Sequence, residues 1–164
     1  MAKRNYLIEG SSGTGKSAVW EELQNRGYKA INGDRELAYR GDPETGRRIE
    51  GPGFGSHIWD VDKVREIVSN KDDDVSFFCG GSRNLHKFID LFDKVFVLDV
   101  DIETLRDRLN RRTADDWDIN DPENSTEFVL RLHATKETLP EGIIIDTARP
   151  INEVVDVILA RTKV

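Results

Sequence analysis

Short apolar runs alternate with charged, amphipathic stretches along most of this 164-residue chain. Five of the runs have the length and apolar content of strands that are buried on both faces of a sheet. Between them, apolar residues recur three or four positions apart, which is the spacing of helices that pack against a sheet. The pattern predicts an α/β fold in three layers, α/β/α, with a five-stranded parallel sheet in the middle. The predicted strands are residues 5–8, 28–31, 75–79, 94–99 and 142–146.

Two segments break this alternation. Glycines, prolines and charges remove any periodicity over residues 40–56, and we expect an excursion over the surface at about residues 35–60. A second irregular insertion covers about residues 113–124. Irregular segments of this length in compact domains usually serve function. The predicted helices are residues 18–23, 35–39, 58–68, 84–91, 102–112, 125–138 and a last helix that starts near residue 150.

Composition narrows the class of protein. The apolar share of 37% and the charged share of 34% are typical of a soluble protein, and we expect one domain spanning residues 1–164. The formal charge of −7 argues against non-specific binding to nucleic acid or to an anionic membrane, and leaves open a local basic groove. The lone Cys79 excludes an internal disulfide framework, and no apolar run reaches the length of a membrane span or a secretory signal. We expect a cytoplasmic protein that is a monomer or a homodimer.

Candidate chemistry concentrates after the first predicted strand. Residues 10–17, GSSGTGKS, fit the phosphate-binding pattern G-x-x-x-x-G-K-[ST] at every fixed position. An ordinary glycine-rich turn is the alternative, but a strand before and a helix after are the context that a phosphate-binding loop requires. Backbone N–H groups and a helix N-terminus converge on phosphate there, Lys16 is expected to bind the β- and γ-phosphates of ATP, and Ser17 the accompanying Mg²⁺. The predicted nucleotide-binding residues of this loop are Gly10, Ser11, Ser12, Gly13, Thr14, Gly15, Lys16, Ser17 and Ala18.

The sheet topology gathers further candidates near this loop. In open parallel sheets, ligands bind beyond the carboxyl ends of the strands. Asp34, residues 80–83 and residues 147–150 each follow a predicted strand, so we expect them at the same edge as the phosphate-binding loop. A site assembled in this way has a cradle for a nucleotide and room for a second substrate.

The chain resembles the small P-loop kinases of the nucleoside monophosphate kinase type, which include adenylate, shikimate and gluconate kinases. Besides the P-loop, residues 98–112 are similar to the strand and helix that lead into the lid of these kinases. Residues 145–155 are similar to their last strand, adenine-contacting loop and final helix. The resemblance implies a P-loop NTPase fold with a lid at about residues 113–124.

The same resemblance implies roles for several side chains around the nucleotide. By position, Arg108 is expected against the adenine side of the nucleotide, and Arg112 is expected to face the phosphates. Arg149 and Pro150 are expected in the loop that contacts adenine. Arg131, in the helix after the lid, matches a position that often holds another phosphate-binding arginine.

For the second substrate, Asp34 is the most informative residue. In the shikimate and gluconate kinase branch, an acid at the end of the second strand faces the acceptor hydroxyl and the metal, and Asp34 stands at the matching place. Its carboxylate can orient a hydroxyl and accept its proton, while a helix N-cap is the alternative role. Asn32 occupies the place of the second acid of that branch. The predicted acceptor-binding residues are Asp34, Arg35, Trp59, Gly80, Gly81, Arg83 and Arg131, with Arg40, Arg47, Arg48 and His57 as further candidates.

These features predict an ATP-dependent phosphotransferase that moves the γ-phosphoryl group of Mg-ATP to a small-molecule acceptor. Lys16, Asp34 and Arg112 are its expected catalytic residues. Two alternatives remain open. A regulatory NTPase would hydrolyse ATP without an acceptor, using Asp99, which ends an apolar run, as a Walker B acid. A nucleotide-binding module would bind ATP and turn over nothing.

Overall fold

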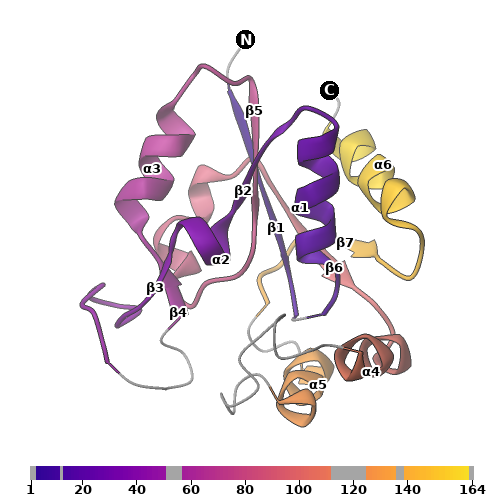
Figure 1. Ribbon diagram of the computed structural model, residues 1–164. Helices are drawn as coiled ribbons and strands as arrows, with labels where there is room; N and C mark the ends of the chain where they lie inside the picture. Colours follow the sequence, from indigo (N-terminus) through magenta and orange to yellow (C-terminus); the bar gives the residue numbers. More distant parts are fainter. Residues whose placement is uncertain (1–2, 12, 51–56, 112–124, 136–138, 163–164) are drawn as a thin grey trace.

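The computed structural model describes residues 3–11, 13–50, 57–111, 125–135 and 139–162 of the chain. Its centre is a parallel sheet of five strands in the order β2-β5-β1-β6-β7 (Figure 1). Every strand predicted from the sequence is present, so the predicted fold class is confirmed. The strands of this sheet are β1 (Arg4–Gly10), β2 (Lys29–Asn32), β5 (Val75–Cys79), β6 (Lys94–Asp99) and β7 (Ile143–Asp146).

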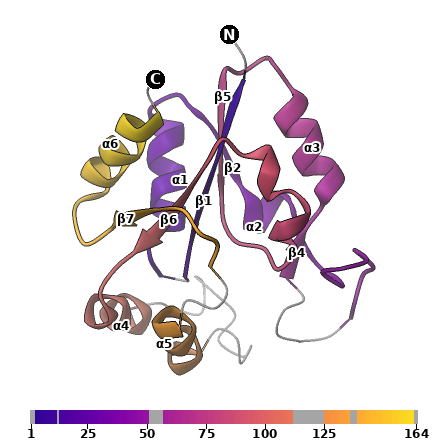
Figure 2. The ribbon, with the colours of Figure 1, turned by 180° about the vertical axis from the view of Figure 1, so that it is seen from behind.

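Helices cover both faces of the sheet. Those of the described residues are α1 (Lys16–Asn25), α2 (Gly33–Glu36), α3 (Val61–Ser69), α4 (Ile102–Asn110), α5 (Thr126–Thr135) and α6 (Ile151–Thr162), with the 3-10 helices η1 (Leu85–Lys87) and η2 (Ile89–Leu91). α1 and α6 lie on one face and α3 on the other, as the two opposite views show (Figures 1 and 2). None of the described helices is long and apolar enough to cross a membrane.

The alternation of side chains along β1 builds two cores. Tyr6 and Ile8 are buried with residues of α1 and α6, whereas Leu7 is buried on the opposite face with residues of α3 and η1. A third, smaller core lies between α4 and α5, at the edge where the strands end (Figure 1). It is made by Val100, Leu105, Leu109, Val129 and Leu130.

The structure differs from the sequence prediction in the segment after β2. The helix predicted over residues 35–39 is reduced to the single turn α2, which precedes an antiparallel pair of short strands, β3 (Ala38–Arg40) and β4 (His57–Trp59). This pairing joins segments far apart in the sequence, so no local periodicity signals it. Residues 51–56, in the middle of the predicted excursion, lie outside the described residues.

A second difference concerns the helix predicted over residues 84–91. The structure has η1 and η2 there, and Phe88 between them has a φ of −144°, outside the helical range. The Phe88 ring stacks on Trp59, with ring centroids 5.7 Å apart and an interplanar angle of 10°. The ring stacking thus accompanies an interruption that the apolar spacing of the sequence does not reveal.

Trp59 is fully buried, and a glycine makes room for it. A Cβ on Gly33 would lie 2.1 Å from Cζ2 of the indole, which no packed structure tolerates. We therefore expect Gly33→Ala to lower the free energy of unfolding by about 1–3 kcal/mol, measured by urea denaturation. In a Trp59→Phe background the indole is replaced by a smaller ring. There, Gly33→Ala should lower the free energy of unfolding clearly less. An equal cost in both backgrounds would show that the steric contact is not the cause.

Candidate active site

The predicted P-loop connects β1 to α1 at the carboxyl edge of the sheet (Figure 1). The backbone N–H and the Oγ1 of Thr14 both donate to the carbonyl of Ser11, at 3.2 and 2.7 Å, and close the loop. Gly15 stands at the N-cap of α1 with a φ of 114°, in the left-handed region that favours glycine. Lys16 and Ser17 therefore occupy the first turn of α1. The loop joins a helix N-terminus to a cation, as a phosphate site requires.

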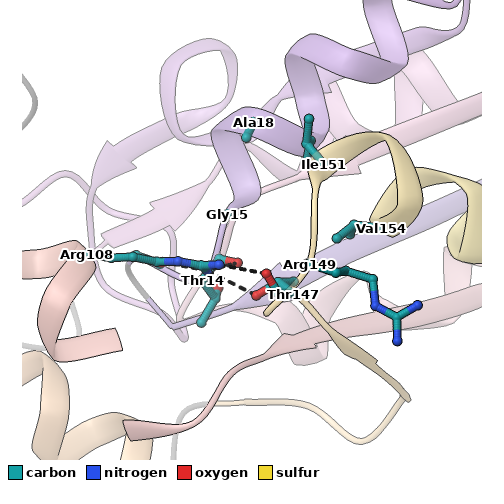
Figure 3. Close-up of a pocket in the computed structure, with 9 residues that line it drawn as sticks. Thr14, Gly15, Ala18, Arg108, Thr147, Arg149, Ile151 and Val154 are labelled. Carbon is teal, nitrogen blue, oxygen red and sulfur yellow. Dashed lines mark hydrogen bonds between the residues drawn. The ribbon is translucent and has the colours of Figure 1, made fainter. Parts of the chain in front are cut away.

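A cavity of about 320 Å³ adjoins the P-loop (Figure 3). Its walls come from the P-loop, from α4 and from the loop between β7 and α6, which are distant in the sequence. The size is that of a pocket for a small molecule. The residues that line it are Gly13, Thr14, Gly15, Ala18, Arg108, Thr147, Arg149, Ile151 and Val154.

Arg108 connects the walls of this cavity. Its Nη1 donates to the carbonyls of Gly13 and Thr14, at 3.4 and 3.2 Å, and to Oγ1 of Thr147 at 3.2 Å. Its Nη2 donates to the carbonyl of Thr147 at 2.6 Å. Arg149 lines the same cavity but extends its guanidinium away from Arg108 (Figure 3). Arg108 therefore fixes the P-loop relative to the loop after β7.

On the other side of the P-loop, Asp34 meets His57 and Gly81. Oδ1 of Asp34 lies 3.0 Å from Nε2 of His57 and accepts a hydrogen bond from the Gly81 N–H at 3.3 Å. Burial raises the pKa of Asp34, but the hydrogen bond from His57 and the charge of Lys16 outweigh burial, so this pKa lies below its ordinary value. The N-cap of α2 is Asn32, so Asp34 does not have the capping role that was its alternative. An ionised, partly exposed carboxylate results.

Glu9, the penultimate residue of β1, is a member of this cluster that the sequence analysis missed. Its carboxylate is buried, accepts a hydrogen bond from the Gly10 N–H at 2.9 Å, and lies 3.8 Å from Nζ of Lys16. A Cβ on Gly81 would lie 2.5 Å from Oε1 of Glu9, so the glycine allows the two segments to meet. Burial raises the pKa of Glu9 to about 7, although Lys16 lowers it. An acid inside an apolar strand, directly before the P-loop, was the available signal.

His133 of α5 also reaches the P-loop. Its Nε2 lies 2.7 Å from the carbonyl of Val100 and 3.3 Å from Oδ1 of Asp99, and its Nδ1 lies 3.1 Å from Oγ of Ser11. A carbonyl only accepts, so Nε2 is the donor, and in the neutral ring Nδ1 accepts from the Ser11 hydroxyl. Arg131 is exposed and lies roughly 200° around the helix axis from His133. α5 thus presents His133, and not Arg131, to the P-loop.

Several predicted acceptor residues do not meet at this cluster. Trp59 is fully buried in the core, so the structure corrects the expectation that its ring is offered to an acceptor. Arg35 is exposed on α2. Arg83, in contrast, adjoins the cluster: its backbone N–H donates to the carbonyl of His57 at 2.9 Å, and its positive charge acts on Glu9.

Four further expectations fall at or beyond the margins of the site. Pro150 precedes α6, where its carbonyl accepts from the N–H groups of Glu153 and Val154. Ser12 and Arg112 lie outside the described residues, as does the predicted lid.

The oxygen donors of the site suit a magnesium ion that arrives with a nucleotide. Ser17 is exposed in the first turn of α1. Mg²⁺ in nucleotide sites is held by one or two protein oxygens together with phosphates and water. Among the described residues, no group of three or more His, Cys, Asp or Glu side chains could hold a metal ion. Ser17 is the residue expected to share such an ion with the nucleotide.

Comparisons with known proteins agree with this architecture. A family model described as an AAA domain matches residues 7–131, while no curated protein sequence matches the chain significantly. A shikimate kinase from Bacteroides thetaiotaomicron has 12% sequence identity and a TM-score of 0.58, with 98% of this chain and 99% of that chain covered. A gluconokinase from Sinorhizobium meliloti has 22% identity and a TM-score of 0.54, with 96% and 90% covered. A shikimate kinase from Acinetobacter baumannii in complex with shikimate has 19% identity and a TM-score of 0.58, with 98% and 95% covered. At these identities the likeness shows the fold.

The raised pKa of Glu9 predicts a pH-dependent stability. Between its ordinary pKa of 4.5 and about 7, the folded chain keeps a proton that the unfolded chain has lost, so the free energy of unfolding falls as the pH rises. Glu9→Gln should remove this loss and stabilise the protein at pH 8 by up to about 3 kcal/mol, but not at pH 4. Urea denaturation at both pH values checks this. Equal effects of the substitution at the two pH values would contradict the assignment to Glu9.

Proposed function

Because this chain belongs to the AAA domain family, we propose that it transfers the γ-phosphoryl group of Mg-ATP to a small-molecule acceptor. The observation that carries this proposal is the position of Lys16, whose Nζ lies 3.8 Å from Oε1 of Glu9 and whose charge acts on Asp34. A cation for the nucleotide phosphates thus adjoins an acid that can face an acceptor. The shikimate kinases and the gluconokinase that share the fold support a small hydroxylated acceptor.

The nucleotide half of the site consists of the P-loop and the adjoining cavity. In the proposal, the base of ATP enters the cavity between Arg108 and the start of α6, where Ile151 and Val154 give an apolar wall. The phosphates lie on the backbone N–H groups of the P-loop at the N-terminus of α1. Lys16 binds the β- and γ-phosphates, and Ser17 offers its hydroxyl to Mg²⁺. The ion supplies neutralisation of the charge on the phosphates.

The acceptor half is built around Asp34. In the proposed reaction, an acceptor hydroxyl oxygen forms a bond to the γ-phosphorus, and the bond from that phosphorus to the β–γ bridging oxygen breaks, which gives the phosphorylated acceptor and ADP. Asp34 orients the hydroxyl and accepts its proton. Its lowered pKa keeps it ionised at neutral pH, and the hydrogen bonds from His57 and Gly81 fix its orientation. In the proposal, Arg112 contacts the negative charge that develops on the transferred phosphoryl group.

The geometry supports this proposal over a regulatory NTPase with Asp99 as the Walker B acid. Asp99 ends β6, where its Oδ1 accepts from the Val100 N–H at 3.0 Å and lies 3.3 Å from Nε2 of His133. Its carboxylate therefore takes part in the contact between β6 and α5. Lys16, in contrast, is 3.8 Å from Glu9 and interacts with the charge of Asp34.

The first test is ADP release from Mg-ATP, alone and with nucleosides, nucleoside monophosphates, sugar acids and hydroxylated antibiotics. We expect one class of acceptor to stimulate release.

Lys16→Ala should lower the stimulated rate roughly 10²- to 10³-fold, because the charge on the transferred group loses its cation. Asp34→Asn should lower kcat roughly 10²-fold and leave the affinity for ATP within about threefold. Steady hydrolysis that no acceptor alters would instead favour the regulatory NTPase.

The cavity makes a separate prediction about the base of the nucleotide. Ala18 lines the cavity from the exposed side of α1, so Ala18→Trp should fill part of it and weaken ATP binding at least tenfold. Glu21→Trp, one turn further along the exposed side of α1, is the matched control and should bind ATP as the wild type does. Isothermal calorimetry measures both affinities. Unchanged binding by Ala18→Trp would place the base elsewhere.

A further inference from the structure

The P-loop lysine has a carboxylate neighbour that phosphate binding alone does not explain. Nζ of Lys16 lies 3.8 Å from Oε1 of Glu9. The Glu9 side chain is only 5% exposed, and that of Lys16 is 18% exposed. Lys16 is also the cation proposed to bind the β- and γ-phosphates. The same ammonium group therefore serves two kinds of anion, a carboxylate of the protein and the phosphates of the nucleotide.

The surroundings of Glu9 contain groups of both signs. Lys16 of α1 faces it, and Arg83, after the glycine turn that follows β5, adds a second positive charge. Asp34 of α2 adds a negative charge, and His57 of β4 is hydrogen-bonded to Asp34. The Gly10 N–H donates to Oε1 of Glu9. The Gly10 N–H and the positive charges of Lys16 and Arg83 thus stabilise the ionised carboxylate, whereas Asp34 opposes it.

The arrival of a nucleotide changes this balance. The phosphates bring several negative charges to the vicinity of Lys16, and at a partly buried site like charges a few ångströms apart repel more strongly than they do in water. Glu9 has little room to move away from them, because its side chain is buried and a Cβ on Gly81 would already lie 2.5 Å from its Oε1. A fixed, buried carboxylate next to an incoming anion relieves the repulsion by binding a proton.

We propose that Glu9 is a positioning residue. It pairs with Lys16 before the nucleotide binds, and it takes up a proton when the phosphates bind Lys16. This inference rests on the nucleotide-binding half of the proposed function and adds to it a coupling between nucleotide binding and pH. This protonation needs no further reactant, because the proton comes from the solvent and stays on the carboxyl group of Glu9. The neutral acid keeps an oxygen that accepts from the Gly10 N–H.

The acidity of Glu9 is suited to this exchange. Burial raises its pKa to about 7, so the proton is available at neutral pH. Bound phosphates raise that pKa further, because a neighbouring negative charge disfavours the ionised form. A group with a higher pKa in the complex favours binding at low pH, and that advantage is lost as the pH rises through the pKa of the complex. Nucleotide affinity should therefore fall between pH 7 and pH 9.

Calorimetric titration with Mg-ADP tests the inference without turnover. Measured at pH 7.5 in two buffers of different ionisation enthalpy, binding to the wild type should take up roughly 0.5 proton, the amount for a pKa that rises by about one unit. Glu9→Gln should show no uptake and should bind Mg-ADP roughly 3- to 10-fold more tightly than the wild type at pH 9. Glu21→Gln, which removes an exposed carboxylate from α1, should behave as the wild type.

A second measurement does not depend on a variant. In wild-type protein labelled with ¹³C at glutamate carboxyl carbons, one resonance should titrate near pH 7 and move to a higher pH with Mg-ADP. Binding without proton uptake, or uptake that persists in Glu9→Gln, overturns the inference and leaves the proposed function intact. No binding of Mg-ADP at all overturns both. A merely structural role for Glu9 would change stability in Glu9→Gln but not the number of protons taken up.

Discussion

The parallel pairing of β1 with β5 on one side and β6 on the other is the constraint on which the rest of the structure depends. Ile8 is in register with Cys79 and with Phe96, so the three parallel strands run to a common edge of the sheet. The chain can then turn into the P-loop directly beside the glycine turn after β5 and beside Asp99. Without that common edge, a lysine from α1 and a carboxylate from α2 could not share one electrostatic environment.

The sequence predicted what is local and periodic. The five strands and the P-loop follow from short apolar runs and from a fixed spacing of four identities, and both are present. The pair of β3 with β4 was missed, because its partners are separated by a long segment without a pattern. Trp59 was misjudged because an aromatic residue in a polar excursion was expected at the surface, whereas its ring fills the space that Gly33 leaves.

The candidate site was predicted in the same uneven way. Residues of the P-loop motif line the cavity. Arg108, which the resemblance to the small kinases placed beside the nucleotide, lines it as well. Glu9 and His133 escaped notice, because neither belongs to a sequence motif. Only the three-dimensional arrangement brings Glu9 to Lys16, and His133 to Ser11. Arg112 and the predicted lid after it are not among the described residues, so their roles remain predictions.

The separate core between α4 and α5 has a mechanical meaning. These helices bury their apolar residues against each other, and Arg108 and His133 supply polar contacts from them to the P-loop. The polar contacts connect this helix pair to Thr14 through Arg108 and to Ser11 through His133. One helix pair therefore holds two points of the loop that would bind the phosphates.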